Sequence, residues 1–436
     1  MKHDSTIRAA LFAAAATAAV VPASAPGAGF GLEQGSARGN ANAAALMAKG
    51  GEPSSLYWNS ATITQLEGTQ TEISVTAIRP AAEVKTKSPY TGETAVGKGN
   101  NHVWTIPAAY LVHRLSDDWF FGFGVFTRYG LGAEFPQTWA GRYGNSKAEI
   151  LSLDFAPQIA WKATDRLSLA AGVSVRYFDI ELAQKIDAAG LAGLRNPNDP
   201  SPSPFDVDQN LHGDDVKPAF DLGLTYKISD DWTFGAAYHS RINFVVKGDA
   251  KWRRPAPVAA MAPGAFLDQP FRSRNYNPDK IMAGLAWDAS DRLTLGFGAT
   301  YTTWHLYDDL HIKLDRDMAG PGTSRLKSVK EWHDAWRLTF GGDWALDDEW
   351  TLRGSYTWDQ SPINGVWADY LVPGDNRHIF GLGLGWSRGA WSVEGSYFYE
   401  CVDDFTVHAR PRNGVFDGKY QNAYGHAVSL SVTRRW

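Results

Sequence analysis

The sequence of 436 residues contains a single cysteine, Cys401. One cysteine excludes an intramolecular disulfide and a zinc site built from several thiolates, so we interpret Cys401 as an ordinary strand residue. A nucleotide-binding fingerprint is also missing, because the glycine clusters FGFG and GLGLGW lie in strand patterns with no helix after them. The sequence therefore predicts neither a metal site nor a cofactor.

Long apolar runs and a strong excess of one charge are also missing. Only residues 9–21 form an apolar run, and it is shorter than the roughly 20 residues of a spanning helix. Lys2 and Arg8 precede this run, and a small-residue segment follows it with Ala25 at the minus-three position, which predicts a cleavable signal peptide over residues 1–27. The net charge of -5 does not indicate a nucleic-acid partner.

Aromatic residues and glycine, by contrast, are abundant: the chain has 43 Gly, 18 Trp, 17 Tyr and 21 Phe. Trp and Tyr form the interfacial girdles of membrane β-barrels, and Gly suits crowded, curved sheets. A soluble all-β domain with an aromatic core would share this composition. Composition alone leaves both alternatives open.

An acidic turn followed by an aromatic and glycine run recurs along the chain. In residues 167–177 the odd-numbered positions are Leu, Leu, Ala, Val, Val and Tyr, and the even-numbered positions are Ser, Ala, Gly, Ser and Arg. Alternate residues of a strand point to opposite faces, so one face is apolar and the other small or polar. The recurring segments are LSDDWFFGFGVF (115–126), TDRLSLAAGVSV (164–175), SDDWTFGAAY (229–238), SDRLTLGFGATY (290–301), LDDEWTLRGSYTW (346–358) and RGAWSVEGSYFY (388–399).

Short acidic turns alternate with longer, irregular connections. This layout is typical of outer-membrane barrels, whose periplasmic turns are short and whose extracellular loops are long. We expect an all-β fold, a transmembrane antiparallel β-barrel of about fourteen strands, running from near Gln70 to the terminal Trp436. The irregular turn spacing disfavours a propeller, and the paired Asp residues lack EF-hand spacing, so solvated turn carboxylates are the simpler interpretation.

Residues 28–66 differ from the rest, since Gly, Ala and Asn dominate there. A short helix over residues 40–49 is expected, ended by the glycine pair that follows. About eight strands already give a barrel interior just filled by its own side chains, so a barrel of about fourteen needs something else in the lumen. We expect residues 28–66 to form this plug, or hatch; a mobile periplasmic leader is the alternative.

Five segments carry a family resemblance. The chain resembles the FadL-type outer-membrane transporters of long-chain fatty acids and other hydrophobic compounds. The resemblance implies a fourteen-stranded barrel over residues 67–436, an N-terminal hatch and a third strand kinked so that the wall opens sideways. It also implies a monomer in the outer membrane of a Gram-negative bacterium. The segments are AGFGL (28–32), EPSSLYWNSATIT (52–64), RYGLGAEFPQTWAGRYG (128–144), YTTWHLYDDLHIKL (301–314) and HDAWRLTFGGDWALDDEWTLRGSYTWDQSPI (333–363).

The resemblance also assigns candidate site residues. The family's hatch motif Asn-Pro-Ala corresponds to a segment with Ser in place of Pro, which removes a locked φ. The third-strand kink falls on a segment with two glycines, for which simple barrel curvature is the alternative explanation. Where the family binds the ligand carboxylate with a basic residue, this chain has Gln followed by Lys. The candidates are Phe30, Asn59, Ser60 and Ala61 in the hatch, Tyr129, Gly130, Leu131 and Gly132 at the kink, and Gln184 and Lys185 at the ligand headgroup.

The resemblance implies passive transport of a hydrophobic solute. A sixteen-carbon chain gains up to about 12 kcal/mol on leaving water, so capture is easy and release needs a movable plug and a side exit. Long-chain fatty acids and aromatic hydrocarbons are both candidate substrates. An outer-membrane lipase using His305, His311 or His378, or a surface receptor, are further alternatives, although no nucleophile motif accompanies these histidines. We expect a non-enzyme whose partners are hydrophobic small molecules and outer-membrane lipid.

Overall fold

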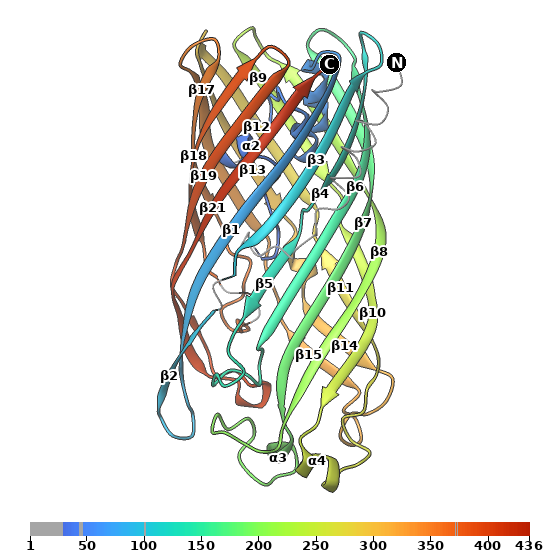
Figure 1. Ribbon diagram of the computed structural model, residues 1–436, viewed down its shortest axis with the longest axis vertical. Helices are drawn as coiled ribbons and strands as arrows, with labels where there is room; N and C mark the ends of the chain where they lie inside the picture. The colour runs from blue at the N-terminus through green and yellow to red at the C-terminus, as the bar shows by residue number, and fades with distance from the viewer. Residues whose placement is uncertain (1–28, 43–46, 100–101, 371, 373) are drawn as a thin grey trace.

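The computed structural model describes residues 29–42, 47–99, 102–370, 372 and 374–436. The predicted signal peptide lies outside these residues. The described chain forms one antiparallel sheet that closes on itself, because the last strand pairs with the first from Gln70–Arg435 to Lys87–Asp417. Figure 1 shows the resulting tall barrel.

The barrel wall contains 14 transmembrane strands, as the sequence predicts. Several of them are built from two consecutive elements, such as β4 with β5, and β9 with β10. The strands are β1 (Thr69–Lys87), β2 (Thr94–Lys98), β3 (Trp104–Arg114), β4 (Trp119–Phe126), β5 (Gly130–Glu134), β6 (Lys147–Lys162), β7 (Leu167–Asp187), β8 (Asp206–Lys227), β9 (Trp232–His239), β10 (Ile242–Arg253), β11 (Gln269–Asn277), β12 (Lys280–Ser290), β13 (Leu293–Thr302), β14 (Asp309–Leu314), β15 (Arg325–Val329), β16 (Ala335–Ala345), β17 (Trp350–Asp359), β18 (Arg377–Arg388), β19 (Trp391–Val402), β20 (Phe405–Val407) and β21 (Asp417–Arg435).

The six recurring acidic segments form the tight turns at one end of the barrel. Around the first turn, the Ser116 hydroxyl accepts hydrogen bonds from the backbone N–H groups of Asp118 (3.3 Å) and Trp119 (3.1 Å). The Asp347 carboxylate does the same for Trp350, at 2.7 Å. In these two turns Ser and Asp close the turn through their own side chains, and Trp starts the next strand.

The long loops lie at the opposite end of the barrel from the C-terminus (Figure 1). They include the short helices α3 (Ala188–Leu191) and α4 (Ala256–Met261). Short turns mark the periplasmic end of an outer-membrane barrel and long loops mark its extracellular end. Among the described helices, none is long and apolar enough to cross a membrane.

The outer surface carries an apolar band between two aromatic girdles. The first girdle, next to the periplasmic turns, includes stacked pairs such as Trp119–Trp161, with ring centroids 5.7 Å apart. Trp and Tyr prefer this level because each has an apolar ring and a polar group. Exposed members of the first girdle are Trp119, Trp161, Trp232, Trp287, Trp344, Trp350 and Trp391, and those near the other end are Trp336, Tyr356, Tyr397 and Tyr424.

The alternation in β7 assigns its two faces as the sequence predicts. Val173 is 59% exposed on the outer surface, whereas its neighbour Ser174 is fully buried on the lumen side. From Leu167 to Val175 every second residue points outward, and each of these outward residues is apolar, so this stretch of β7 faces lipid.

Arginine at Val173 is expected to destabilise the inserted barrel by about 2–4 kcal/mol, the cost of a cation near the bilayer midplane. Val96 in β2 is a matched control: it is 53% exposed on the extracellular hairpin, where arginine costs about 0–1 kcal/mol. Urea unfolding of both variants in lipid vesicles, followed by the gel shift of the folded barrel, measures the difference. Equal destabilisation would contradict the assigned membrane level.

The lumen in the periplasmic half is filled by the N-terminal segment, drawn in blue inside the barrel in Figure 1. This segment contains helix α2 (Ala37–Asn42) and the 3-10 helices η1 (Pro53–Tyr57) and η2 (Ser60–Gln65). The helix predicted over residues 40–49 thus begins and ends earlier: Met47–Lys49 form a turn, and residues 43–46 lie outside the described part. We call residues 29–66 the hatch.

Candidate functional site

The third transmembrane strand is interrupted between β4, which ends at Phe126, and β5, which begins at Gly130. β3 pairs with β4 only from Ala109 to Arg114, and β5 pairs with β6. Within the described residues, the Trp104–Ala108 part of β3 pairs with β1 alone, and β5 pairs with β6 alone. The hydrogen-bond ladder of the wall therefore has a gap between β3 and β5.

The position of this interruption overlaps the segment assigned from the family resemblance. The break covers Thr127, Arg128 and Tyr129, whereas Gly130 and Gly132 lie in the regular ladder of β5, opposite residues of β6. Near the extracellular end of the gap, His102 and Glu134 approach to 3.3 Å across it. The gap in the ladder thus runs from the last β3–β4 pair to this contact.

The start of the hatch is hydrogen-bonded to the interrupted strand from inside the barrel. The backbone N–H of Leu32 donates to the carbonyl of Arg128 at 2.8 Å, and that of Gly130 donates to the carbonyl of Phe30 at 2.9 Å. Gly31 and Tyr129 form an isolated antiparallel bridge between these bonds. Backbone groups that leave a sheet need other partners when buried, and here the hatch supplies them.

Two buried arginines connect the interrupted segment, from the lumen side, to the strands that follow it in the wall, β6, β7 and β8. Arg128 donates to Asp221 of β8 at 2.9 Å, and its guanidinium lies 4.8 Å from the Phe126 ring centroid. Arg176 of β7 contacts both oxygens of Asp154 and lies over the Tyr129 ring at 4.8 Å. Buried charges require such paired, hydrogen-bonded geometry, so these contacts fix the path of the chain at the break.

Phe30, assigned to the hatch from the sequence, lies at the centre of an aromatic cluster. It is 1% exposed, and its ring centroid is 4.8 Å from that of Trp304, 5.5 Å from Tyr307 and 5.9 Å from Trp332. Edge-to-face and tilted ring pairs of this kind are favourable beyond their buried area. The preceding Gly29 has a φ of +63°, and a Cβ there would come within 2.6 Å of the Trp332 ring.

A cavity lies on the extracellular side of this cluster, with Phe30 in its wall. The cavity is small: the space that can hold the centre of a water-sized molecule is about 20 Å³, and it is open on one side. Leu131 of β5 and Ile150 of β6 line it, so the cavity reaches the strands beside the gap in the ladder. The lining residues are Phe30, Leu131, Ile150, Ile180, Leu182, Tyr307, Leu310, Lys330, Trp332, Ile363, Trp367, Ala368, Asp369 and Val372.

Lys330 and Asp369 are the charged members of this lining, and they form an ion pair with each other. Lys330 lies in the connection between β15 and β16, and its backbone N–H donates to the carbonyl of Asp308 at 2.8 Å. The pair places a buried ammonium and a carboxylate at one side of an otherwise apolar cavity. Ligand pockets commonly combine an apolar wall with a few such orienting groups.

The segment Asn59–Ser60–Ala61 lies at the start of η2 and anchors the hatch to the wall. The Asn59 amide donates to the carbonyls of Met47 (3.1 Å) and Leu224 of β8 (3.0 Å), and its oxygen accepts from the N–H of Ala61. Asn59 is therefore an N-cap that also binds the barrel. All three residues are buried, far along the chain from Phe30.

The two residues assigned to the ligand headgroup, Gln184 and Lys185, lie on opposite faces of β7. Gln184 points into the lumen and donates to Gln209 at 2.9 Å. Lys185 points outward and forms an ion pair with Asp208, which also binds Arg253. Neither residue lines the cavity that Phe30 closes.

Ion pairs fix the hatch to the inner surface of the wall. Glu33 binds Lys280 of β12 at 2.5 Å, and Arg38 binds Asp343 of β16 at 2.8 Å. Burial raises the pKa of Glu33, but Lys280 and Arg337 outweigh burial and bring that pKa below its usual value. The hatch therefore carries a charged carboxylate that its partners in the barrel hold in place.

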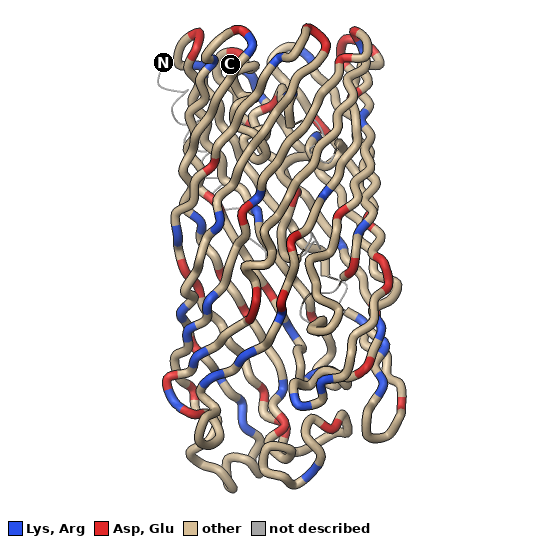
Figure 2. Tube along the Cα trace, turned by 180° about the vertical axis from the view of Figure 1, so that it is seen from behind, with Lys and Arg blue, Asp and Glu red and all other residues tan. Residues whose placement is uncertain are grey.

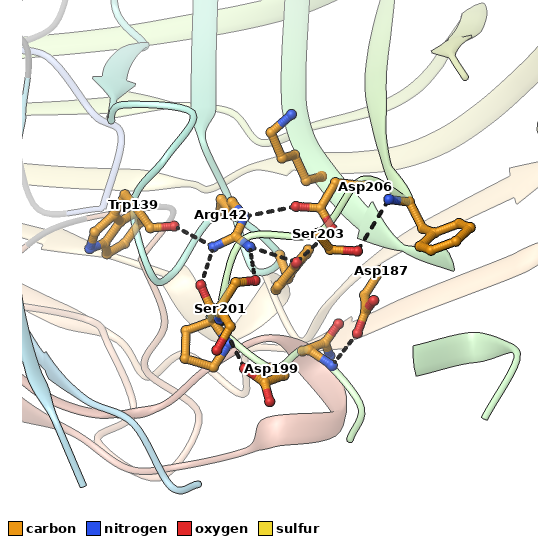
Figure 3. Close-up of polar contacts among 12 residues, drawn as sticks. Trp139, Arg142, Asp187, Asp199, Ser201, Ser203 and Asp206 are labelled. Atoms are coloured by element: carbon orange, nitrogen blue, oxygen red, sulfur yellow. Dashed lines mark hydrogen bonds and ion pairs between the residues drawn. The ribbon is translucent and has the colours of Figure 1, made fainter. Parts of the chain in front are cut away.

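Two loops at the extracellular end of the barrel, residues 135–146 and 188–205, are joined through Arg142 (Figure 3). Its guanidinium binds the Asp206 carboxylate at 3.1 Å and donates to the carbonyl of Ser201 at 3.0 Å. Asp187, at the end of β7, accepts from the backbone N–H of Asn198 at 2.8 Å. These bonds join the two loops to each other and to the end of β7.

The comparisons with known proteins agree with this architecture. The family model described as outer membrane protein transport protein (OMPP1/FadL/TodX) matches residues 18–433. The chain belongs to this family. Its members are outer-membrane transport channels for hydrophobic compounds, so the fold class, the outer-membrane location and the general function expected from the sequence are confirmed.

Individual relatives are distant but align over most of the chain. The long-chain fatty acid transport protein of Escherichia coli O6:H1 is 21% identical, with 75% of this chain and 76% of that protein covered. The 47 kDa outer membrane protein of Pasteurella multocida is 25% identical, with 72% and 73% covered. An outer membrane protein of Neisseria meningitidis serogroup B is 24% identical over 88% of each chain.

Two solved structures show the same fold. A FadL homologue of Pseudomonas aeruginosa has a TM-score of 0.82 at 22% identity, with 93% of this chain and 99% of that chain covered. The toluene transporter TodX of P. putida has a TM-score of 0.72 at 18% identity, with the same coverage. At these identities the likeness concerns the fold, not the substrate.

Sequence reasoning missed part of the cavity. Trp332, Lys330 and Asp369 line it and were not assigned to a site. Trp304, which packs on Phe30 beside the cavity, was not assigned either, although YTTWHLYDDLHIKL contains it. The histidines considered for a lipase are bound elsewhere: His305 contacts Asp334 at 2.6 Å. A lone Trp in a connection between strands carries no signal that its partner is the N-terminal hatch, and a lone Lys carries none that it pairs with an Asp of another loop.

Proposed function

We propose that this protein takes up long-chain fatty acids or related hydrophobic molecules passively, through the inner cavity and then sideways through the wall at the third transmembrane strand. It would act as a monomer and not as an enzyme. The observation that supports this most directly is the position of the cavity. Phe30 closes it toward the periplasmic half of the lumen, while Leu131 lines it from β5, next to the gap in the ladder.

The route follows from the physical character of each region. A solute that has shed its water can rest among Leu131, Ile150 and Ile180 at little cost, because these side chains are apolar. Continuing toward the periplasm would require passage through the polar contacts that fix the hatch, such as Glu33 with Lys280. Sideways exit between β3 and β5 leads directly into the bilayer.

Aromatic hydrocarbons are the second candidate substrates, and the aromatic cluster around Phe30 favours them. Phe30, Tyr307 and Trp332 line the cavity and offer ring faces and edges for a flat apolar ligand. A fatty acid differs by its carboxylate, which would need the ammonium of Lys330, already shared with Asp369. The contribution of this ion pair to binding therefore separates the two classes of substrate.

Replacing the ion pair by the neutral pair Lys330→Met and Asp369→Asn is expected to weaken oleate binding by about tenfold to a hundredfold, since a hydrogen bond to a charged group contributes about 1.5–3 kcal/mol. Both partners are changed because a single change would leave the other charge buried and unpaired. Binding of toluene should stay within about twofold.

Lys330→Arg is the matched control, because it keeps the charge and the partner and should retain oleate binding. Titration of purified protein in detergent with oleate and with toluene gives the affinities. Toluene binding with no oleate binding in the wild type would favour the aromatic alternative, and binding of neither would contradict the proposed function.

A further inference from the structure

The outer surface toward the extracellular end carries a dense group of cations on four neighbouring strands, β10, β11, β14 and β15. Figure 2 shows that Lys and Arg gather toward this end of the barrel. All four side chains of the group point outward and are exposed. The group, called here the cationic row, consists of Lys247, Arg272, Lys313 and Arg325.

The strand register places these cations directly opposite one another. Lys247 pairs with Arg272 across β10 and β11, Arg272 with Lys313 across β11 and β14, and Lys313 with Arg325 across β14 and β15. Residues opposite one another in an antiparallel pair have Cβ atoms about 4.5–5.5 Å apart. Like charges at this distance repel each other, so the row is unfavourable unless anions lie against it.

A second set of cations follows one pleat closer to the bilayer. Arg274 of β11 lies opposite His311 of β14, which lies opposite Lys327 of β15. Lys327 has its own partner, Asp309, at 2.9 Å. Arg274 therefore adds a further outward cation next to the cationic row.

Carboxylates of the protein do not neutralise the row. Asp214 of β8 lies opposite Lys247 at one end of it, and Asp249 lies one pleat farther out on β10. Within the part of the chain that the structure describes, none of the four cations forms an ion pair. Elsewhere on the outer surface the pattern differs, since Lys98 binds Glu83 at 3.0 Å and Lys419 binds Asp404 at 2.8 Å.

The level of the row matches the headgroups of the outer leaflet. Along β11 the outward residues are Arg272, Arg274 and then Tyr276, each about 7 Å from the next along the strand. Beyond Tyr276 the chain enters the apolar band at Ile281 of β12, which is exposed. On β11 the row therefore lies two pleats beyond Tyr276, on the extracellular side of the apolar band, where the aliphatic stems of Lys and Arg extend toward lipid phosphates.

We propose that the cationic row is a binding site for a phosphorylated lipid of the outer leaflet, with one or more phosphate groups held across β10, β11, β14 and β15. Arg272 and Arg325 offer planar guanidinium groups that bind phosphate in a bidentate manner, and Lys247 and Lys313 add charge between and beside them. The acyl chains of the lipid would lie along the apolar band below. This lipid is distinct from the transported solute, because the row faces away from the lumen.

The test uses the full-length protein in non-ionic detergent and bis-phosphorylated lipid A as the probe, with the same glycolipid stripped of its phosphates beside it. The variant Lys247→Gln, Arg272→Gln, Lys313→Gln, Arg325→Gln should bind lipid A at least about tenfold more weakly, since each cation near anionic lipid contributes measurably. Affinity for the stripped glycolipid should not change. Lipid retained on the folded barrel is counted by native mass spectrometry.

A second variant removes the same number of outward cations where each already has a carboxylate partner: Lys98, Arg253, Arg388 and Lys419, all to Gln. It should bind lipid A as the wild type does. Equal loss in both variants would show a general charge effect and overturn the site. Equal retention of lipid A and the stripped glycolipid by the wild type would overturn it without any variant.

Discussion

A cross-link across the gap between β3 and β5 is expected to abolish uptake of a hydrophobic substrate by cells while leaving its binding to the purified protein intact. His102 and Glu134 supply the attachment points, since their side chains approach to 3.3 Å across the gap. Both are changed to Cys in a Cys401→Ser background, and a short thiosulfonate reagent that reductant cleaves joins them. The link holds the two edges together and covers the mouth of the gap.

The cavity itself is untouched by this link, because neither His102 nor Glu134 lines it. Substrate should still enter from the extracellular side and rest against Phe30, but it could not reach the bilayer sideways. Uptake of labelled oleate or toluene by intact cells measures the effect, and reductant should restore it. Titration of the cross-linked protein measures binding in parallel.

The matched control joins Glu83 and Lys98 by the same chemistry. These side chains also form an ion pair, at 3.0 Å, near the extracellular end, but β1 and β2 are already joined by a continuous ladder there. This link should leave uptake unchanged. Normal uptake through a fully cross-linked gap would rule out the sideways exit and direct attention to a path through the hatch.

Deleting the hatch, residues 29–66, is expected to turn the barrel into a leaky polar pore. Barrels of 16–18 strands hold an aqueous channel and those of about eight are filled by their own side chains, so 14 strands leave space for water once the plug is gone. The wall behind the hatch is polar, with Glu72, Asp343 and Glu394 facing the lumen. Water and small ions can therefore pass along this polar inner wall once the hatch is absent.

Single-channel conductance in planar bilayers and entry of a polar dye into cells measure this leak. The variant Phe30→Ala is the control, because it opens the floor of the cavity but keeps the ion pairs of Glu33 and Arg38 that hold the hatch. It should not conduct. A deleted barrel that folds, inserts and conducts no better than the wild type would contradict the plugging role of residues 29–66.

Much of the barrel could be derived from local sequence. Period-two alternation identified the lipid face at Val173 and the lumen face at Ser174, because a strand sends neighbouring side chains to opposite sides. The turns before Trp119 and Trp350, which Ser and Asp close, could be predicted from the sequence because their hydrogen bonds join residues three positions apart. Local rules suffice wherever the partners are local.

The same alternation rule could have tested the assigned headgroup residues. Gln184 and Lys185 are adjacent in one strand, so they cannot both point into the lumen. Their assignment came from position in the family pattern, and the structure brings neither to the cavity, where Lys330 and Asp369 carry the charge instead. Position in a pattern does not report which face a residue occupies.

The sequence by itself determined a closed sheet of alternating strands with short turns at one end and a polar N-terminal segment to fill it. Tertiary structure alone decided where the wall is interrupted. At the break, Leu32 of the hatch donates to the carbonyl of Arg128, and the carbonyl of Phe30 accepts from the N–H of Gly130. It also decided the cavity, in which Phe30 meets Trp304 and Trp332 from the far side of the barrel. Strand periodicity is a property of neighbouring residues, whereas these contacts join segments that only closure of the barrel brings together.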